Sequence, residues 1–346
     1  MLDYFVKCAK SHNLLVEVID FITNRVQVTN NLLKFVNFAT KYFSMIPHNV
    51  IINAALEVGF DLVGVVRAEA LDDERKRFSK WLLEGCGSTL SYLERNVDKR
   101  FDSRLLVDGA RSVVVCAVSY LSRYGRGYDA GCRTKIASYA LARDYHLTIK
   151  EMLADVARRL TASYPELRFR AFTDSAPVAE KSLAVRAGLG WIGRNSLVVN
   201  PRLGSMFHLG ELVISEEVDS YDVPLEGVGC GSCRRCVDAC PNGAIREDRS
   251  VDTRRCISCR TIEREGCDTP IRLDGWIYGC DACQSLCPFN QHAAEHRNSA
   301  FDPLFDPTGL DAEAWLTMTD EEFAALAGAT TMPRAGLARI KANIDK

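Results

Sequence analysis

The sequence predicts a mixed α/β (α+β) domain, followed by a small cysteine-rich module and a short helical tail. Three observations support this fold class. Apolar runs typical of buried strands alternate with stretches of helical periodicity as far as about residue 222. Ten of the 14 cysteines then lie between residues 230 and 287. After residue 293 the chain has no cysteine, and it closes with a further helical signal.

The start of the chain differs from the rest in composition. Residues 1–53 hold seven of the fourteen asparagines and only one arginine, Arg25, whereas the remainder is rich in Ala, Arg, Gly and Leu. We therefore expect residues 1–45 to be an N-terminal extension of unknown role, and the natural domain to begin near Met45.

Residues 46–222 carry the predicted α/β domain. A helix in IPHNVIINAALEVG stops at Gly59, because glycine readily adopts the left-handed conformation that ends a helix, and the buried strand FDLVGVV follows. HLTIKEMLADVARRLTASYP has helical periodicity and ends before Pro165. The other predicted strands are ARSVVVCAVSYL, LRFRAFTD, NSLVVN and HLGELVIS.

Residues 223–293 form the predicted cysteine module, which SYDVPLEGVGCG links to the first domain, and residues 294–346 form the tail. In the tail, TDEEFAALAG has the signature of a helix N-terminus. We expect Thr319 to cap this helix and Glu322 to complete a capping box.

The cysteine module opens with the spacing C-x2-C-x2-C-x3-C-P, which starts at Cys230. Bacterial ferredoxins bind [4Fe–4S] clusters with this run, placing three thiolates on one cubane and the fourth on a second. YGCDACQSLCPFN repeats the C-x2-C-x3-C-P ending, and Cys256 lies between the two runs. Eight thiolates are enough for two cubanes, so the sequence predicts a bacterial-ferredoxin-like module with two [4Fe–4S] clusters.

The ferredoxin crossing pattern predicts which thiolates share a cluster. One cluster takes Cys230, Cys233, Cys236 and Cys287, and the other takes Cys240, Cys256, Cys280 and Cys283. The proline after each crossing cysteine is expected to bend the chain away, since proline cannot donate a backbone hydrogen bond. Cys259, three residues after Cys256, could compete as a ligand. The other cysteines are interpreted as buried small hydrophobes or incidental thiols: Cys8, Cys86, Cys116, Cys132 and Cys267.

Other uses of closely spaced cysteines fit less well. Paired C-x2-C elements also form tetrahedral zinc sites, but two runs that end in Cys-Pro favour iron–sulfur clusters. A disulfide framework is weaker still, since no signal peptide precedes the chain and no apolar stretch approaches the roughly 20 residues of a membrane span. Thiolate clusters also require a reducing compartment. We therefore expect a cytoplasmic protein without membrane contact.

The overall composition is that of an ordinary globular protein, with 47% hydrophobic and 25% charged residues. A chain of 346 residues is long enough for one large core and a small appended domain. The net charge of −2 requires no polyanionic partner, although a local basic face could still bind one.

GLGWIG, with Gly188, Gly190 and Gly193, satisfies the G-x-G-x-x-G pattern of dinucleotide sites. That fingerprint must follow a strand and open a helix, but APVAEKSLAVRAG before it is helical and NSLVVN after it is strand-like. We therefore expect no nicotinamide site. The glycines are instead expected to let the backbone approach another ligand or a neighbouring element closely.

Several stretches together resemble the epoxyqueuosine reductase family, cobalamin-dependent iron–sulfur enzymes that complete queuosine in tRNA. They are YLERNVDKRFDSRLLVDGARSVV, KIASYALARDYH, DSAPVAEKSLAVRAGLGWIGRNSLVVNPRLGSMFHLGEL, the two cysteine runs and CISCRTIE. They cover about residues 50 to 293 in the family's order. The family is related by fold to the reductive dehalogenases, which also place a corrinoid beside two [4Fe–4S] clusters.

Three features depart from the family pattern. Cys259 stands where the family commonly has an aromatic residue, the segment between CRTIE and YGCD looks shortened, and no helical-repeat domain like that of longer members follows. The first two departures lie near the expected cobalamin and tRNA contacts, whereas the eight cluster cysteines and DSAPVAEK are retained.

The resemblance implies that residues 46–222 bind cobalamin and that the chain reduces epoxyqueuosine to queuosine at the anticodon wobble position of tRNA. An external donor would supply electrons, which the clusters would pass to cobalamin. Asp174 in TDSAP is the implied proton donor, with a pKa raised by a dry cavity. From the residues alone, Asp174 could instead only cap the helix that starts near Pro177.

The resemblance also implies cobalamin contacts within the matching segments. These are Arg100, Ser138, Tyr139, Asp174, Asn195, Ser258 and Asp281. Each could instead be an ordinary hydrogen-bonded polar residue. His146 in RDYH is a candidate for the wall of the site, and it is not expected to bind cobalt.

The expected partner is the anticodon stem-loop of tRNA, bound by a monomer. Positive charge around the cysteine module suits phosphate contacts, from Arg234, Arg235, Arg254, Arg255 and Arg260. Nearby acidic residues could instead balance that charge on a solvated surface; these are Asp238, Glu247, Asp248 and Asp252. Two other functions stay open: an electron-transfer protein, which has no use for the α/β domain, and a corrinoid reductase acting on a small molecule.

Overall fold

The computed structural model describes residues 45–88, 90–263 and 269–344. The chain divides into two units, Met1–Ile46 and Pro47–Lys346, and the elements below belong to the second. The predicted N-terminal extension, with Cys8, lies outside the described residues apart from its last position, and so does Cys267. No helix in the described ranges is long and apolar enough to cross a membrane.

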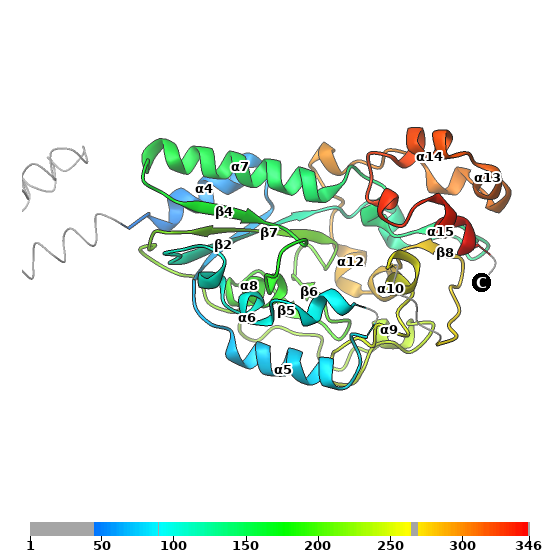
Figure 1. Ribbon diagram of the computed structural model, residues 1–346, viewed down its shortest axis with the longest axis horizontal. Helices are drawn as coiled ribbons and strands as arrows, with labels where there is room; N and C mark the ends of the chain where they lie inside the picture. Colours follow the sequence, from blue (N-terminus) through cyan, green and yellow to red (C-terminus); the bar gives the residue numbers. More distant parts are fainter. Residues whose placement is uncertain (1–44, 89, 264–268, 345–346) are drawn as a thin grey trace, which may run out of the picture. The chain divides into compact units, whose positions relative to one another are not determined.

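A four-stranded sheet forms the centre of the α/β part (Figure 1). Its strands lie in the order β1 (Leu62–Arg67), β2 (Ser112–Ser119), β7 (Phe207–Ile214) and β4 (Phe169–Phe172), and every pairing is antiparallel. All eight residues of β2 are buried, because helices cover both faces of the sheet. These four strands confirm the predicted strands FDLVGVV, ARSVVVCAVSYL, HLGELVIS and LRFRAFTD.

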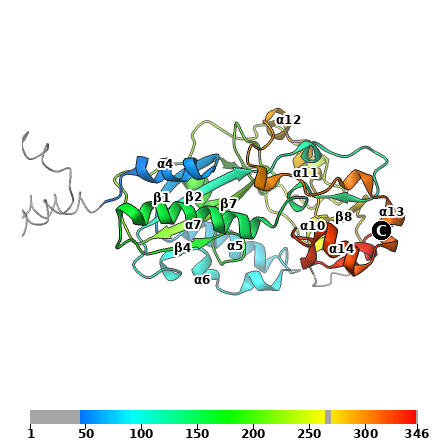
Figure 2. The same cartoon turned by 90° about the horizontal axis from the view of Figure 1, so that it is seen from above.

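Helices α4 (His48–Val58) and α7 (Tyr145–Ser163) pack on one face of the sheet, and α8 (Glu180–Arg186) packs on the other (Figures 1 and 2). α4 ends at Gly59 with a φ of 107°, as predicted. α7 buries an apolar stripe that includes Ile149, Leu153 and Val156. Asp144 caps this helix by accepting a hydrogen bond from the backbone of His146 at 2.9 Å.

The GLGWIG segment follows α8 and runs into a small hairpin of β5 (Trp191–Ile192) and β6 (Val198–Val199). A Cβ at Gly190 would lie only 2.3 Å from the carbonyl oxygen of Val199, so glycine is needed for this close approach. The order helix, turn, strand excludes the strand–turn–helix context of a dinucleotide fingerprint.

The cysteine module contains the short helices α9 (Arg235–Asp238), α10 (Ile257–Ile262), α11 (Ala282–Ser285) and α12 (Pro288–His292). Its strand β8 (Trp276–Tyr278) pairs in parallel with β3 (Lys135–Ile136) from the α/β part. The prolines that follow Cys240 and Cys287 occupy different positions relative to the helices. Pro241 follows the end of α9, whereas Pro288 is the first residue of α12, where its missing N–H costs nothing.

The tail contains α13 (Ala312–Thr317), α14 (Asp320–Ala327) and α15 (Leu337–Ala342). Thr319 and Glu322 form the predicted capping box of α14. Trp315, Met332 and Ile340 are fully buried in one core with Ile136 and Tyr278, so the tail is packed onto the β3–β8 pair.

The remaining helices are α5 (Asp72–Leu83) and the four-residue α6 (Val97–Arg100). The chain also forms 3-10 turns at Ser91–Glu94, Ser103–Leu105, Arg123–Arg126, Ser138–Ala140, Ser299–Phe301, Pro307–Gly309 and Met332–Arg334.

Candidate active site

A cavity of about 290 Å³ opens where β4 ends and β7 begins. Its walls combine residues from the sheet, from α7 and α8, and from the cysteine module. They include Tyr120, Tyr139, Tyr145, Asp174, His208 and Gln284. The walls thus combine aromatic rings with charged and amide side chains, a mixture that can bind and orient an organic ligand.

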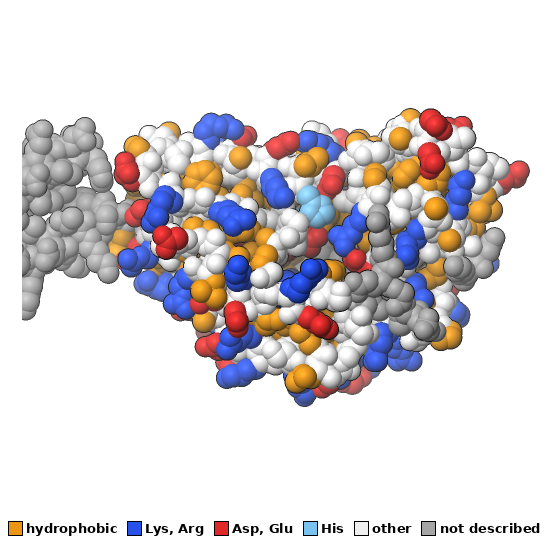
Figure 3. Space-filling view, in the orientation of Figure 1, with side chains coloured by type: hydrophobic (Ala, Val, Ile, Leu, Met, Phe, Trp, Pro, Cys, Tyr) orange, Lys and Arg blue, Asp and Glu red, His pale blue; other side chains and the backbone are white. Residues whose placement is uncertain are grey.

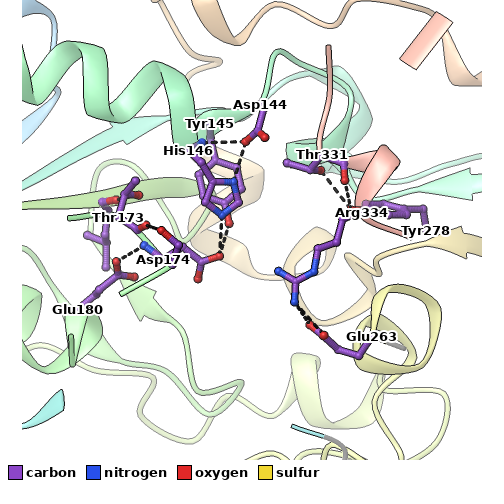
Figure 4. A network of polar contacts seen from close by, with 12 residues as sticks. Asp144, Tyr145, His146, Thr173, Asp174, Glu180, Glu263, Tyr278, Thr331 and Arg334 are labelled. Atoms are coloured by element: carbon purple, nitrogen blue, oxygen red, sulfur yellow. Dashed lines mark hydrogen bonds and ion pairs between the residues drawn. The ribbon is translucent and has the colours of Figure 1, made fainter. Parts of the chain in front are cut away.

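Asp174 lies two residues beyond the end of β4, and its carboxylate is held from two sides (Figure 4). The hydroxyl of Tyr145 donates to Oδ2 of Asp174 at 2.6 Å, and Nε2 of His146 lies 3.1 Å from the same oxygen. The backbone N–H of Asp174 donates to the carboxylate of Glu180. The backbone of Asp174 is left-handed, with a φ of 50°.

These contacts determine the pKa of Asp174. Burial would raise the pKa of Asp174, but the hydrogen bonds from His146 and Tyr145 outweigh it and leave the pKa below its ordinary value. The predicted raised pKa is therefore wrong. The expectation considered burial alone, whereas α7 brings two hydrogen-bond donors to the carboxylate.

The pKa of His146 shifts in the opposite direction. Its Nδ1 lies 2.7 Å from Oδ1 of Asp144, so the imidazole bridges two carboxylates. Burial acts to lower the pKa of His146, but Asp174 and Asp144 raise it above the ordinary value. Asp174 lines the cavity and His146 stands behind it, so the pair can hold one proton at the cavity wall.

His208 provides an apolar, neutral part of the same wall. Its ring stacks on Tyr145, with centroids 4.1 Å apart and an interplanar angle of 8°. Complete burial lowers the pKa of His208 to about 3, so the imidazole is neutral. Its Nε2 has no hydrogen-bond partner among the described residues, which leaves one polar atom available to a ligand.

A second polar group approaches Asp174 from the outer side of the site. Arg334, from the tail, forms an ion pair with Glu263 at 2.8 Å (Figure 4). Burial, Glu263 and Asp174 raise the pKa of Tyr92 to about 12. Burial lowers the pKa of Arg100, while Tyr92, Glu180 and Asp174 oppose that effect. These side chains therefore bring both signs of charge near Asp174.

The first four predicted cluster cysteines lie within electrostatic reach of each other. Burial raises the pKa of Cys236, and the thiols of Cys230 and Cys287 raise it further. Burial also raises the pKa of Cys287, and Cys230 and Cys233 add smaller effects. The indole N–H of Trp191 points to the sulfur of Cys230 at 3.5 Å.

The second four cysteines form a separate group. Burial raises the pKa of Cys280, and Cys256 and Cys240 add to it. Burial likewise raises the pKa of Cys283, and the thiols of Cys280, Cys256 and Cys240 raise it further. The described residues contain no group of three His, Cys, Asp or Glu side chains placed to hold a single metal ion. A cubane, by contrast, binds one thiolate at each of four irons and keeps the sulfurs apart.

Cys259 is placed differently from these eight cysteines. Its thiol hydrogen-bonds with Cys256, which lowers the pKa of Cys256 to about 6. The charge of Glu263, which lies on the side of the site with Tyr92 and Arg334, raises the pKa of Cys259. Cys259 thus faces the outer polar group as well as the second cysteine group.

The second cysteine group adjoins the cavity. Gln284 lines the cavity and directly follows Cys283 in the chain. The side-chain amide of Asn195 donates to the carbonyl of Cys283 at 3.4 Å. A redox group in the cavity would therefore lie between these thiols and Asp174.

Five of the seven residues expected to contact cobalamin are not among the residues that line this cavity. Tyr139 and Asp174 line it directly. Asp281 and Ser138 are buried, and Asp281 Oδ2 accepts the backbone N–H of Ser138 at 2.6 Å, so these two residues stabilise the wall. Ser258 lies on α10, where its carbonyl accepts the hydroxyl of Thr261 at 3.3 Å.

The arginines expected to meet tRNA are partly neutralised. Arg234 forms an ion pair with Glu247 at 2.8 Å, and Arg254 forms one with Asp252 at the same distance. Arg260 donates to the carbonyl of Thr269 at 2.5 Å. Figure 3 shows Lys and Arg side chains spread over one face with acidic ones between them, rather than in one basic patch.

Sequence reasoning missed several residues of the site. Tyr145 and Glu180 lie in RDYH and DSAPVAEK, two segments already singled out, but their contacts with Asp174 depend on the fold. Glu211 carried the clearest signal, because it interrupts the apolar strand HLGELVIS with a charge. Gln284 and His208 gave no local signal.

Comparison with known proteins matches both parts of the chain. A 4Fe-4S double cluster binding domain family matches residues 229–290. The family described as "Epoxyqueuosine reductase QueG, DUF1730" matches residues 100–175. An epoxyqueuosine reductase of Cyclobacterium marinum is 39% identical over 277 residues, which are 79% of this chain and 88% of that protein.

Solved structures agree with the sequence relatives. An epoxyqueuosine reductase with an epoxyqueuosine-modified tRNA stem loop has a TM-score of 0.76 at 28% identity, covering 86% of this chain and 79% of that chain. The enzyme of Bacillus subtilis, solved with its catalytic loop swung out of the active site, has a TM-score of 0.77 at 27% identity over the same shares.

Proposed function

Because the chain belongs to the epoxyqueuosine reductase family, as its motifs predicted, we propose that it reduces epoxyqueuosine to queuosine in the anticodon of tRNA. The relative that holds a modified tRNA stem loop supports tRNA as the substrate. The reaction removes the epoxide oxygen as water and consumes two electrons and two protons. The protein must therefore deliver both electrons and protons to one place.

Two [4Fe–4S] clusters carry the electrons in this proposal. Cys230, Cys233, Cys236 and Cys287 hold one cluster, and Cys240, Cys256, Cys280 and Cys283 hold the other. The matching double-cluster family and the two groups of thiols support this assignment. An external one-electron donor reduces the clusters, since they are carriers and not a source of electrons.

Three observations support a cobalamin site at this cavity. The cavity lies between the second cysteine group and Asp174, its walls are aromatic, and Arg100 Nε and His208 Nε2 are buried without partners among the described residues. Tyr139, Arg100 and Asn195 would hold the cofactor, with Ser138, Asp281 and Ser258 supporting the wall. When bound, cobalamin supplies a strongly reducing centre next to the substrate.

Asp174 and His146 handle the proton. Asp174 faces the cavity and transfers a proton to the leaving oxygen, while His146 restores that proton through the 3.1 Å contact. Tyr145 keeps the carboxylate oriented by its 2.6 Å hydrogen bond. This pair, on a cavity that also adjoins cluster thiols, is the observation that carries the proposal.

The test is conversion of the modified nucleoside. Anaerobically reconstituted protein, cobalamin, a strong one-electron reductant and tRNA that carries epoxyqueuosine should yield queuosine, measured by mass spectrometry of the digested tRNA. Omitting cobalamin should abolish the product. Protein that binds cobalamin and iron but leaves epoxyqueuosine intact would instead indicate a corrinoid reductase for a small molecule.

A further inference from the structure

The backbone at Asp174 needs support from outside its own loop. A left-handed backbone is unfavourable at a residue other than glycine, and it persists only where the surroundings stabilise it. The N–H of Asp174 is bound by the carboxylate of Glu180, six residues further along the chain. This contact ties the Asp174 loop to the first turn of α8.

Glu180 is more than an acidic residue at a helix start. Acidic side chains are common in the first turn, where they interact with the helix dipole. The carboxylate of Glu180 instead reaches out of α8 to the backbone of Asp174 (Figure 4). Its neighbour Lys181 points elsewhere and donates to the carbonyl of Ser196 at 2.9 Å.

Behind Glu180 lies a second carboxyl group with no other role in the proposed reaction. Glu211 is 0% exposed in the central strand β7, between Val115 on β2 and Phe172 on β4. Neither of its carboxylate oxygens accepts a hydrogen bond from a described residue. A charged carboxylate could not remain there, because burial without a partner costs too much free energy.

The buried side chains of Glu180 and Glu211 therefore carry a single negative charge together. Burial and the charge of Glu180 raise the pKa of Glu211 well above its ordinary value. Burial and Asp174 raise the pKa of Glu180 to about 7, and Lys181 opposes this. The other titratable groups that face Glu180 are Arg100 and Tyr145. Glu211 is thus a neutral acid, whose single O–H has the carboxylate of Glu180 as its facing acceptor.

We infer that Glu180 is a positioning residue whose carboxylate holds the Asp174 loop against the cavity, and that the neutral acid Glu211 keeps Glu180 in place. Breaking the contact between Glu180 and the Asp174 backbone releases the loop, since nothing else described binds that N–H. The consequence for turnover rests on the proposed function, because Asp174 matters there as the proton donor.

Hydrogen exchange on the full chain without added cofactor or substrate tests the contact directly. Glu180→Ala removes the acceptor, so the amide of Asp174 should exchange at least tenfold faster in the peptide that contains it. Glu180→Gln keeps a carbonyl oxygen at the same position and should stay within threefold of the original rate. An unchanged rate in Glu180→Ala, or equal acceleration in both variants, would overturn the inference.

Glu69→Gln is the matched control. Glu69 forms an ion pair with Arg186 at the other end of α8, at 2.8 Å, and its side chain is 56% exposed. Removing this charge should leave exchange at Asp174 within twofold. Equal acceleration in Glu69→Gln would show that α8 as a whole is loosened, and it would contradict a specific contact by Glu180.

Glu211 is tested by two variants of similar size. Glu211→Gln keeps a neutral group that can donate to Glu180, and exchange at Asp174 should stay within threefold. Glu211→Leu removes the donor, and exchange should rise at least fivefold while the melting temperature stays near the original. Normal exchange in Glu211→Leu would overturn the part assigned to Glu211.

The kinetics of turnover distinguish a positioning role of Glu180 from a role in binding tRNA. With epoxyqueuosine tRNA, Glu180→Ala should lower kcat about tenfold or more while KM stays within threefold, and Glu180→Gln should restore at least half of kcat. A raised KM with normal kcat would contradict a positioning role. If exchange responds as expected but the unmodified protein never converts the nucleoside, the proposed function fails and the contact stands.

Discussion

Nε2 of His146 lies 3.1 Å from Oδ2 of Asp174, across 28 residues of sequence. Because Asp144 holds the other ring nitrogen at 2.7 Å, the imidazole cannot turn away without losing two contacts. The two carboxylates raise the pKa of His146 although burial acts to lower it. The two carboxylates therefore favour a protonated imidazole next to Asp174.

His146→Gln should lower kcat by about 100-fold, because Asp174 loses the group that returns its proton. KM for tRNA should change less than threefold, since His146 is not part of the cavity lining. Single-turnover conversion of epoxyqueuosine measures this. His48→Gln is the control, because His48 pairs with Asp222 and not with the Asp174 group. Normal turnover in His146→Gln would remove the histidine from the proton path.

The same histidine should make stability depend on pH. The folded pKa of His146 is raised above the unfolded value of about 6.5. Its stabilising contribution is therefore complete below the unfolded pKa and is lost as the pH rises through the folded pKa. The melting temperatures of the original protein and His146→Gln should differ most below about pH 6 and converge as the pH rises through the folded pKa. A difference that grows with pH contradicts the assigned charge.

Much of the scaffold is predictable because it depends on local signals. Apolar runs mark β1, β2 and β7, Gly59 ends α4, and the spacing of the cysteines identifies their chemistry without any structure. The order of the strands is not local. It places β7 between β2 and β4, and no single run of residues specifies that register.

The site is less predictable because its properties come from pairs that are distant in sequence. Asp174 could be identified as a candidate, but its charge depends on Tyr145 and His146, which α7 brings to the end of β4. The ion pair of Arg334 with Glu263 likewise joins the tail to the cysteine module. Residue patterns describe neighbours along the chain, whereas these contacts depend on the packing of separate elements.

Iron content should distinguish Cys256 from Cys259. The reconstituted protein should hold about eight irons, as two cubanes require. Cys259→Ser should keep about eight, because the thiols of Cys280 and Cys283 are coupled to Cys256 and Cys240 instead. Cys256→Ser should lose about four irons with one cluster signal in the electron paramagnetic resonance spectrum. Loss of iron from Cys259→Ser alone would show that the two cysteines exchange roles.

A chain that begins at Met45 should remain folded and bind cobalamin as tightly as the full chain. Pro47–Lys346 form a unit of their own, and that unit contains every residue assigned to the site. Titration of cobalamin, followed by its absorption spectrum, compares the two chains. Insoluble or cobalamin-free truncated protein would show that residues 1–44 belong to the core.

Single-turnover reduction by Asp174→Asn tests the central claim most directly, namely that Asp174 delivers the proton at the cavity. Asparagine keeps the size and a hydrogen-bonding oxygen but has no acid proton. With cobalamin, reductant and epoxyqueuosine tRNA, the variant should keep its irons, its cobalamin affinity and its tRNA affinity, and turnover should fall about 100-fold or more. Near-normal formation of queuosine by Asp174→Asn would contradict the account.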